Sequence, residues 1–171
     1  MTIRTLAETD VEAFRGFRLA ALRESPLSFG ASAESEAALS ADEWVRRLSP
    51  ERGVVYGSFD SSDALVATLG VYVLEGDDER AGPWLWTMYV SPTVRRRGIA
   101  RQLMRRVIDD LLARGERRPL RLHVTNASAS ARTLYESFGF EVTREEMDLP
   151  WHSGHVVNRA EMRLPPHRTS H

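Results

Sequence analysis

Three consecutive arginines and a glycine stand where a predicted strand gives way to a predicted helix, and these residue types suit phosphate binding. The run is Arg95-Arg96-Arg97-Gly98-Ile99-Ala100. The first turn of a helix exposes unpaired N–H groups and a partial positive charge, and the small residues Gly98 and Ala100 leave room for a ligand beside them. The arginines add fixed charge, so the run fits a pyrophosphate site. The alternative is a solvated basic turn before an amphipathic helix. The run matches neither the dinucleotide fingerprint nor the P-loop pattern.

A second stretch, residues 122–140, ends in Leu134-Tyr135-Glu136-Ser137-Phe138-Gly139-Phe140. Together the two stretches resemble a known family. Arg95-x-x-Gly98-x-Ala100, after a strand ending Met88-Tyr89-Val90, resembles the acetyl-CoA motif of the GNAT superfamily of N-acetyltransferases. Leu134-Tyr135-Glu136 followed by Gly139-Phe140 resembles its second signature, and the spacing between the two motifs also agrees. The resemblance covers about residues 53 to 164.

The resemblance implies roles for particular residues toward acetyl-CoA as cosubstrate. Backbone groups of Met88 and Val90, on either side of Tyr89, would pair with the pantetheine arm, and the amides of residues 96–100 would hold the pyrophosphate. Tyr135 would protonate the leaving thiolate. The pKa values suit this role, since a phenol titrates at about 10 and a thiol at about 8.5. Without the family, Tyr135 reads as a core tyrosine on a short helix.

The implied activity is acetyl transfer to a primary amine by direct attack in a ternary complex. The chain has no cysteine, so no thiol can carry the acetyl group. The alternative is a catalytically silent acyl-CoA-binding sensor or regulatory module of the same fold. The expected partners are a small-molecule or peptide amine and, by analogy with the superfamily, a second copy in a homodimer.

The sequence departs from the family pattern in two places. Many members carry asparagine where this chain has Ser128, and Asn126 is a candidate substitute. Many also carry glutamate near the start of the strand ending Tyr89-Val90, where this chain has Trp84 and Trp86. A general base is needed because an amine must be neutral to attack. The candidates, none of which stands above the rest, are Glu34, Glu36, Glu79, His123 and His155.

Acidic residues before the sheet suggest the acceptor. Glu34 and Glu36 lie in a small, polar segment, Ser25 to Ala38, and favour a cationic acceptor such as a polyamine, an aminoglycoside-like amine or a peptide N-terminus. His152 and His155 are three residues apart, but Ser153-Gly154 between them indicates a hairpin turn rather than a helix. We therefore expect no metal site.

Periodicity and end signals predict the helices that position these residues. The first helix begins near Thr9, with Glu12 as its capping-box partner, and ends before Pro26; the second begins at Ser40, with Glu43 as partner. The clearest helix, Ile99 to Arg114, has one apolar stripe and a stop at Gly115. A short helix over Ser128–Phe138 ends at Gly139.

Alternating and β-branched runs predict the strands. They are Gly53–Phe59, Ala64–Leu74, Trp84–Val90, Leu120–Thr125, Phe140–Leu149 and Val156–Leu164. Trp84, Trp86, Met88 and Val90 are expected on one face of their strand. A helical crossover makes Trp84–Val90 and Leu120–Thr125 parallel neighbours. The fold class is therefore α+β, and the family resemblance sharpens it to a mixed, mostly antiparallel sheet of six to seven strands, with two central parallel strands that splay, flanked by about four helices.

Length and composition limit the class of protein. The chain of 171 residues fits one domain, with helices and an acceptor-side loop in residues 1–50, the sheet and acetyl-CoA core in 53–164 and a tail in 165–171. All 23 basic residues are arginine, yet the net charge is only -1, which argues against nucleic-acid binding. The absence of a long apolar run or a signal-like start predicts a cytoplasmic protein without membrane attachment.

Overall fold

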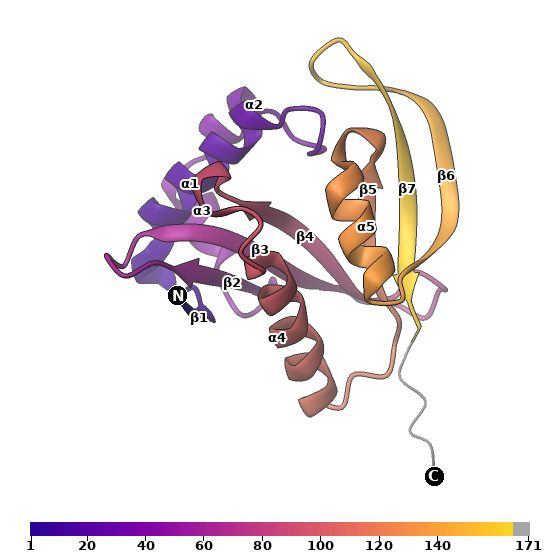
Figure 1. Ribbon diagram of the computed structural model, residues 1–171, viewed down its shortest axis with the longest axis horizontal. Helices are drawn as coiled ribbons and strands as arrows, with labels where there is room; N and C mark the ends of the chain where they lie inside the picture. The colour runs from indigo at the N-terminus through magenta and orange to yellow at the C-terminus, as the bar shows by residue number, and fades with distance from the viewer. Residues whose placement is uncertain (166–171) are drawn as a thin grey trace.

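The computed structural model describes residues 1–165, and its centre is one seven-stranded sheet (Figure 1). The strand order is β1-β2-β3-β4-β5-β7-β6. All neighbouring strands are antiparallel except β4 and β5, which run parallel. The strands are β1 (Thr2–Thr5), β2 (Val54–Phe59), β3 (Leu65–Leu74), β4 (Gly82–Val90), β5 (Leu120–Thr125), β6 (Glu141–Pro150) and β7 (Val156–Leu164). The mixed α+β sheet with one central parallel pair is confirmed.

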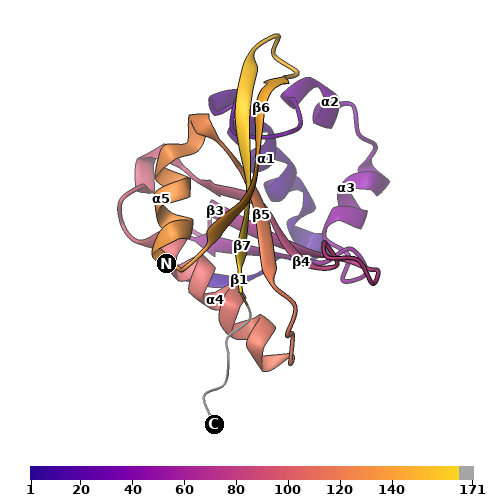
Figure 2. The same cartoon turned by 90° about the vertical axis from the view of Figure 1, so that its right-hand side faces the viewer.

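Within residues 1–165, five α-helices lie on the two sides of the sheet (Figure 2). They are α1 (Val11–Glu24), α2 (Ala33–Ala37), α3 (Ala41–Arg47), α4 (Ile99–Ala113) and α5 (Ala129–Ser137). Helices α4 and α5 pack on one face around a core that includes Leu103, Val107 and Tyr135. Helices α1 and α3 pack on the other face around Phe14 and Trp44. The apolar stripe predicted for α4 is thus the side that faces the sheet.

One of the two capping boxes expected from the sequence is present in the structure, and the other is not. As predicted, Ser40 caps α3: its Oγ accepts a hydrogen bond from the Glu43 amide, and the Glu43 carboxylate accepts one from the Ser40 amide. The prediction of a Thr9–Glu12 capping box is wrong. Residues Glu8–Asp10 form a 3-10 turn, and the Asp10 carboxylate accepts a hydrogen bond from the Ala7 amide at 2.8 Å.

Two short elements at the N-terminal end were not predicted. Strand β1 is only four residues long and gives little periodicity to detect. Helix α2 lies inside the segment expected to be a loop, and Ser32 caps it. Of the predicted tail, residues 166–171 lie outside the residues that the structure describes.

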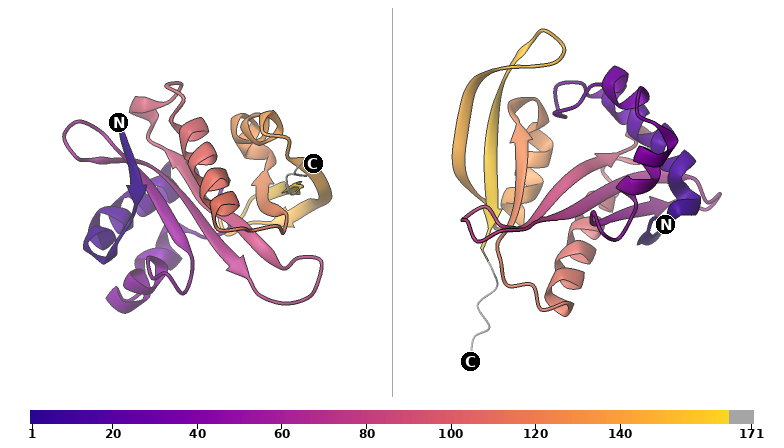
Figure 3. Two further views of the ribbon diagram at one scale, coloured as in Figure 1. Left: turned by 90° about the horizontal axis from the view of Figure 1, so that it is seen from below. Right: turned by 180° about the vertical axis from the view of Figure 1, so that it is seen from behind.

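The parallel strands β4 and β5 pair only at Trp84 and Arg121, and beyond that point they diverge (Figure 3). A β-bulge in β4 accompanies the divergence. Thr87 has a positive φ of 52°, and the register with β3 shifts there. An extra residue in a strand reverses which face the following side chains occupy.

The bulge makes the prediction of a common face for Trp84, Trp86, Met88 and Val90 wrong. Trp86 packs with the α1–α3 core, whereas Met88 and Val90 pack with the α4–α5 core. The bulge therefore turns Met88 and Val90 toward α4 and α5 at the place where the sheet opens.

No helix within residues 1–165 combines the length and apolar character needed to cross a membrane.

Candidate active site

The backbone between β4 and α4 forms a concave surface of N–H groups. Gly98 is the N-cap of α4 with a φ of 76°, and Arg96 two residues earlier has a φ of 64°. Left-handed residues of this kind turn successive amides toward one side, and the helix dipole adds positive potential there. A Cβ at Gly98 would have no neighbour closer than 4.0 Å, so the space beside it is open. This surface can bind an anion.

A cavity of about 620 Å³ adjoins this loop, and we call it the outer cavity. It brings together most of the residues predicted to bind the cosubstrate: Met88, Tyr89, Val90, Arg95, Arg96, Gly98, Ile99, Ala100 and Ser128. Arg97 and Asn126 are not part of its lining. Its walls come from the end of β4, the start of α4 and the start of α5.

Arg95 positions the loop rather than offering a free charge. Its Nε donates to the Val90 carbonyl oxygen at 2.9 Å, and its terminal nitrogens donate to the Glu24 carboxylate at 3.2 and 3.0 Å. The hydrogen bonds from Arg95 hold the pKa of Glu24 below its usual value. Arg95 lines the outer cavity as predicted for a cosubstrate-binding residue, but its guanidinium is paired with Glu24 of α1.

Arg101 is a cationic residue of the outer cavity that sequence reasoning missed. It lies in the first turn of α4, donates to Ser137 Oγ at 3.0 Å and stacks over the Phe138 ring. Its position three residues after Gly98 was the available signal, since one helical turn brings it back to the side of the amides.

Asn126 and Ser128 have separate roles. The Asn126 Oδ1 accepts a hydrogen bond from the Asn158 amide at 3.1 Å, which ties the end of β5 to β7. Ser128 donates to Ser28 Oγ at 2.8 Å, and both serines line the outer cavity. Asn126 is thus occupied in the sheet, while Ser128 faces the cavity.

A smaller cavity of about 250 Å³ continues from the outer one, and we call it the inner cavity. Five residues line both: Ser28, Phe29, Met88, Ser128 and Ala131. Tyr135 and His123 line the inner cavity only. The two cavities therefore meet where strands β4 and β5 separate.

Tyr135 is 5% exposed and packs against Phe140. Burial raises the pKa of its hydroxyl above the ordinary value of 10.0. The phenol is therefore protonated at neutral pH, as a proton donor must be.

His123 is the one candidate base that lines the inner cavity. Its ring lies 5.0 Å from that of Trp84, and its Nε2 lies 3.6 Å from the Glu161 carboxylate of β7. Burial and then the positive charge of Arg159 lower the pKa of His123 from 6.5, against the opposing effect of Glu161. The imidazole is thus neutral at neutral pH and can accept a proton.

The other base candidates lie elsewhere. Glu34, Glu79 and His155 are exposed and line neither cavity. Glu36 is only 3% exposed, and its carboxylate accepts from Arg18 at 3.0 and 2.9 Å and lies 3.3 Å from Arg47. Burial opposes ionisation, but the two guanidinium groups outweigh it and lower the pKa of Glu36.

The prediction that Glu36 recognises a cationic acceptor therefore fails on geometry. Its charge is neutralised inside the protein between α1, α2 and α3. Glu34 lies on the same short helix and does not reach either cavity.

Four hydrogen bonds from distant segments fix residues 26–29 between the two cavities. Thr125 Oγ1 donates to the Leu27 carbonyl, and Ser128 to Ser28. The β6–β7 turn adds bonds from Trp151 Nε1 to Pro26 and from His152 Nε2 to Phe29. His152 is thus a structural donor, and within residues 1–165 no group of His, Asp and Glu side chains could hold a metal ion.

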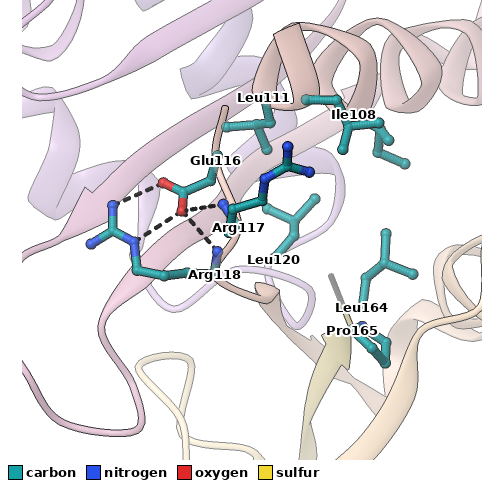
Figure 4. Close-up of a pocket in the computed structure, with 9 residues that line it drawn as sticks. Ile108, Leu111, Glu116, Arg117, Arg118, Leu120, Leu164 and Pro165 are labelled. Carbon is teal, nitrogen blue, oxygen red and sulfur yellow. Dashed lines mark hydrogen bonds and ion pairs between the residues drawn. The ribbon is translucent and has the colours of Figure 1, made fainter. Parts of the chain in front are cut away.

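A third hollow, of about 40 Å³, lies between α4, the start of β5 and the end of β7 (Figure 4). Its one carboxylate, Glu116, accepts hydrogen bonds from the backbone amides of Arg117 and Arg118 and from the Arg118 guanidinium. These bonds lower the pKa of Glu116 to about 2. A fully occupied carboxylate in so small a hollow offers no chemistry comparable with that of the two joined cavities.

Comparison with known proteins agrees with this geometry. The family model described as Acetyltransferase (GNAT) family matches residues 18–140. The [ribosomal protein bS18]-alanine N-acetyltransferase of Salmonella typhimurium is 40% identical over 72 residues, which span 42% of this chain and 48% of that relative.

Two solved structures share the fold. The ribosomal-protein-S18-alanine N-acetyltransferase of Escherichia coli has a TM-score of 0.70 at 24% identity, covering 99% of this chain and 96% of that one. A GNAT superfamily phosphinothricin acetyltransferase of Sinorhizobium meliloti, in complex with AcCoA, has a TM-score of 0.76 at 20% identity, covering 96% and 88%.

Proposed function

Because the chain belongs to the acetyltransferase (GNAT) family, we propose that it transfers the acetyl group of acetyl-CoA to a primary amine. The observation that carries the proposal is the meeting of the two cavities. The outer one presents backbone amides and the inner one presents an acid and a base. A thioester group at their junction would be within reach of both.

The outer cavity has the features needed to hold acetyl-CoA. The amides of residues 96–100 would bind the diphosphate, with Arg96 and Arg101 beside them. In the part of the chain that the structure describes, β4 has no strand partner on the β5 side beyond Trp84, so backbone groups there can pair with the amide-containing arm. Arg95 already uses the Val90 carbonyl, which leaves the groups of Met88 and the Val90 N–H for that purpose.

His123 and Tyr135 would handle the protons of the reaction. The amine nitrogen attacks the thioester carbonyl carbon, a C–N bond forms and the C–S bond breaks. His123, neutral at the start, accepts the proton that leaves the nitrogen, directly or through a water molecule. Tyr135 gives its proton to the departing sulfur and is then reprotonated from solvent. Tyr135 is buried, whereas His123 is exposed, so the proton that His123 accepts can pass on to solvent.

The acceptor is a separate question. Two relatives are named as ribosomal-protein-alanine N-acetyltransferases. The aligned region covers about half of the first relative, so a polypeptide N-terminus is one candidate and a small-molecule amine the other. A homodimer is a further proposal, by analogy with the superfamily.

A broad amine screen monitored by release of free CoA tests the proposed transfer. We expect acetyl-CoA to bind and at least one class of primary amine to cause thiol release. Tight binding of acetyl-CoA without turnover on any amine would instead favour the alternative of a silent acyl-CoA sensor. Absence of binding by calorimetry would contradict both.

A further inference from the structure

The inner cavity is lined by cationic and aromatic side chains. Arg18 comes from α1 and Arg159 from β7, so positive groups enter from both sides of the opening in the sheet, and the neutral His123 lies on β5 between them. Among residues 1–165, no aspartate or glutamate belongs to this lining. The aromatic members of the lining are Phe29, Tyr72, Trp84, Trp86, Tyr135 and Trp151.

The carboxylates behind this lining do not neutralise it. Three carboxylates pair with residues of the lining, and each of them faces two guanidinium groups. Glu36 lies 2.9 Å from Arg18 and 3.3 Å from Arg47. Glu146 lies 2.6 Å from Arg159 and 3.8 Å from Arg144, and Glu161 lies 3.6 Å from Arg80 and 4.0 Å from Arg121. The surroundings therefore carry an excess of positive charge, in a chain whose net charge is -1.

Arg18 has hydrogen-bonding capacity left for a ligand. Its side chain is 6% exposed, and Nε and one terminal nitrogen bind Glu36. Within residues 1–165, the other terminal nitrogen makes a single long contact of 3.5 Å, with Thr87 Oγ1 at the bulge of β4. A guanidinium has five N–H donors, and oxyanions are the partners that satisfy them best.

We propose that the acceptor is a small primary amine that also carries a carboxylate or similar oxyanion, held by Arg18 and Arg159. This inference rests on the proposed acetyl transfer and names the substrate class. The volume of about 250 Å³ suits a ligand of amino-acid size, and the aromatic walls suit its carbon skeleton. The positive surroundings also lower the pKa of a bound amine, which favours the neutral nucleophile.

The test compares acceptors that differ in one charge. A panel of α-amino acids is assayed by thiol release, each beside its own amide, together with polyamines. We expect kcat/KM to favour the free acid over its amide by about tenfold or more, since a charged hydrogen bond is lost. Arg159→Gln should remove most of this preference. The matched control is Arg132→Gln, which makes the same change of charge on α5, where the side chain pairs with Glu136 and lines neither cavity.

Binding provides a second readout that does not depend on turnover. The same pairs are titrated by calorimetry into protein loaded with CoA. Tighter binding of the acids than the amides, lost in Arg159→Gln and kept in Arg132→Gln, supports the inference even if no pair is acetylated, and then only the proposed transfer fails. Equal or faster acetylation of amides or polyamines overturns the inference and leaves acetyl transfer standing. Equal or absent binding of acids and amides overturns it too.

Discussion

The outer and inner cavities are built from different parts of the chain. The outer cavity depends on backbone amides from one short segment, residues 95–100, whose conformation is set locally by Gly98 and the start of α4. The inner cavity depends on side chains from α1, β4, β5, α5 and β7, which only the folded sheet brings together. A site built from backbone groups tolerates many different sequences. A site built from side chains depends on the identity of each of those side chains.

The ion pairs beside the two cavities differ in how exposed they are to solvent. Glu24 and Arg95 join α1 to the outer loop with side chains 39% and 43% exposed. Glu36 and Arg18, beside the inner cavity, are 4% and 6% exposed. Water screens the first pair, so its worth is small. The second pair has lost its water, and either partner left alone would be a buried unpaired charge.

The largest expected effect is loss of cosubstrate binding in Gly98→Glu. The new side chain places bulk and negative charge beside the amides of α4, and a residue with a Cβ is strained at a φ of 76°. We expect acetyl-CoA affinity to fall by at least about a hundredfold, measured by calorimetry. Gly115→Glu is the matched control, because Gly115 has a φ of 75° with open space around it and lies at the other end of α4. Equal affinity loss in the two variants would contradict the anion site.

The next largest effect is a difference in how much the two ion pairs contribute to the free energy of unfolding. Glu36→Gln leaves Arg18 and Arg47 facing each other without their carboxylate, and we expect a loss of about 3 kcal/mol in the free energy of unfolding at pH 7. Glu24→Gln should lose less than about 1 kcal/mol. Denaturant titration measures both. Similar losses would remove the distinction drawn between the regions.

The contribution of Glu36 to the free energy of unfolding depends on pH. The pKa of Glu36 in the folded protein lies below its ordinary value of 4.5, so its contribution to stability is present above pH 4.5. It is lost as the pH falls from 4.5 through the folded pKa. Wild type should therefore lose more stability than Glu36→Gln over this acid range.

Tyr135→Phe should separate chemistry from binding. Removing the hydroxyl leaves the ring packed against Phe140 and takes away the proton donor, so kcat should fall by about a hundredfold while acetyl-CoA affinity stays nearly unchanged. Tyr56→Phe is the control, since that hydroxyl donates to Asp110 and lines neither cavity. Full kcat in Tyr135→Phe would show that the assigned acid role is wrong.

The smallest expected effect concerns His123. Its lowered pKa places the acid limb of the kcat/KM profile below pH 6.5, and His123→Gln should reduce kcat/KM by about tenfold and remove that limb. Glu161→Gln removes a carboxylate that raises the pKa of His123, so the limb should move to lower pH. His155→Gln, in the exposed β6–β7 turn, is the control. An unchanged profile in both active-site variants would point to another proton acceptor.

Sequence reasoning succeeded for elements with strong local signals. The stripe of α4, the Ser40–Glu43 capping box and the last two strands all appear close to where they are expected. It failed at strand β1, at the Thr9–Glu12 cap and at the shared face of β4. These depend on sheet pairing or on a competing side chain, such as Asp10, that the periodicity does not report.

The sequence alone determined the family, the fold class and the place of the loop whose amides we propose to bind the diphosphate, because a strand end, a glycine and an amphipathic helix are properties of neighbouring residues. The tertiary structure decided what the charged residues do. Arg95 is occupied by Glu24, Glu36 is enclosed between two arginines, and His123 alone among the base candidates faces Tyr135's cavity. The physical reason is that the strength and availability of a charge depend on the water and partners around it, and both are fixed only when distant segments pack together.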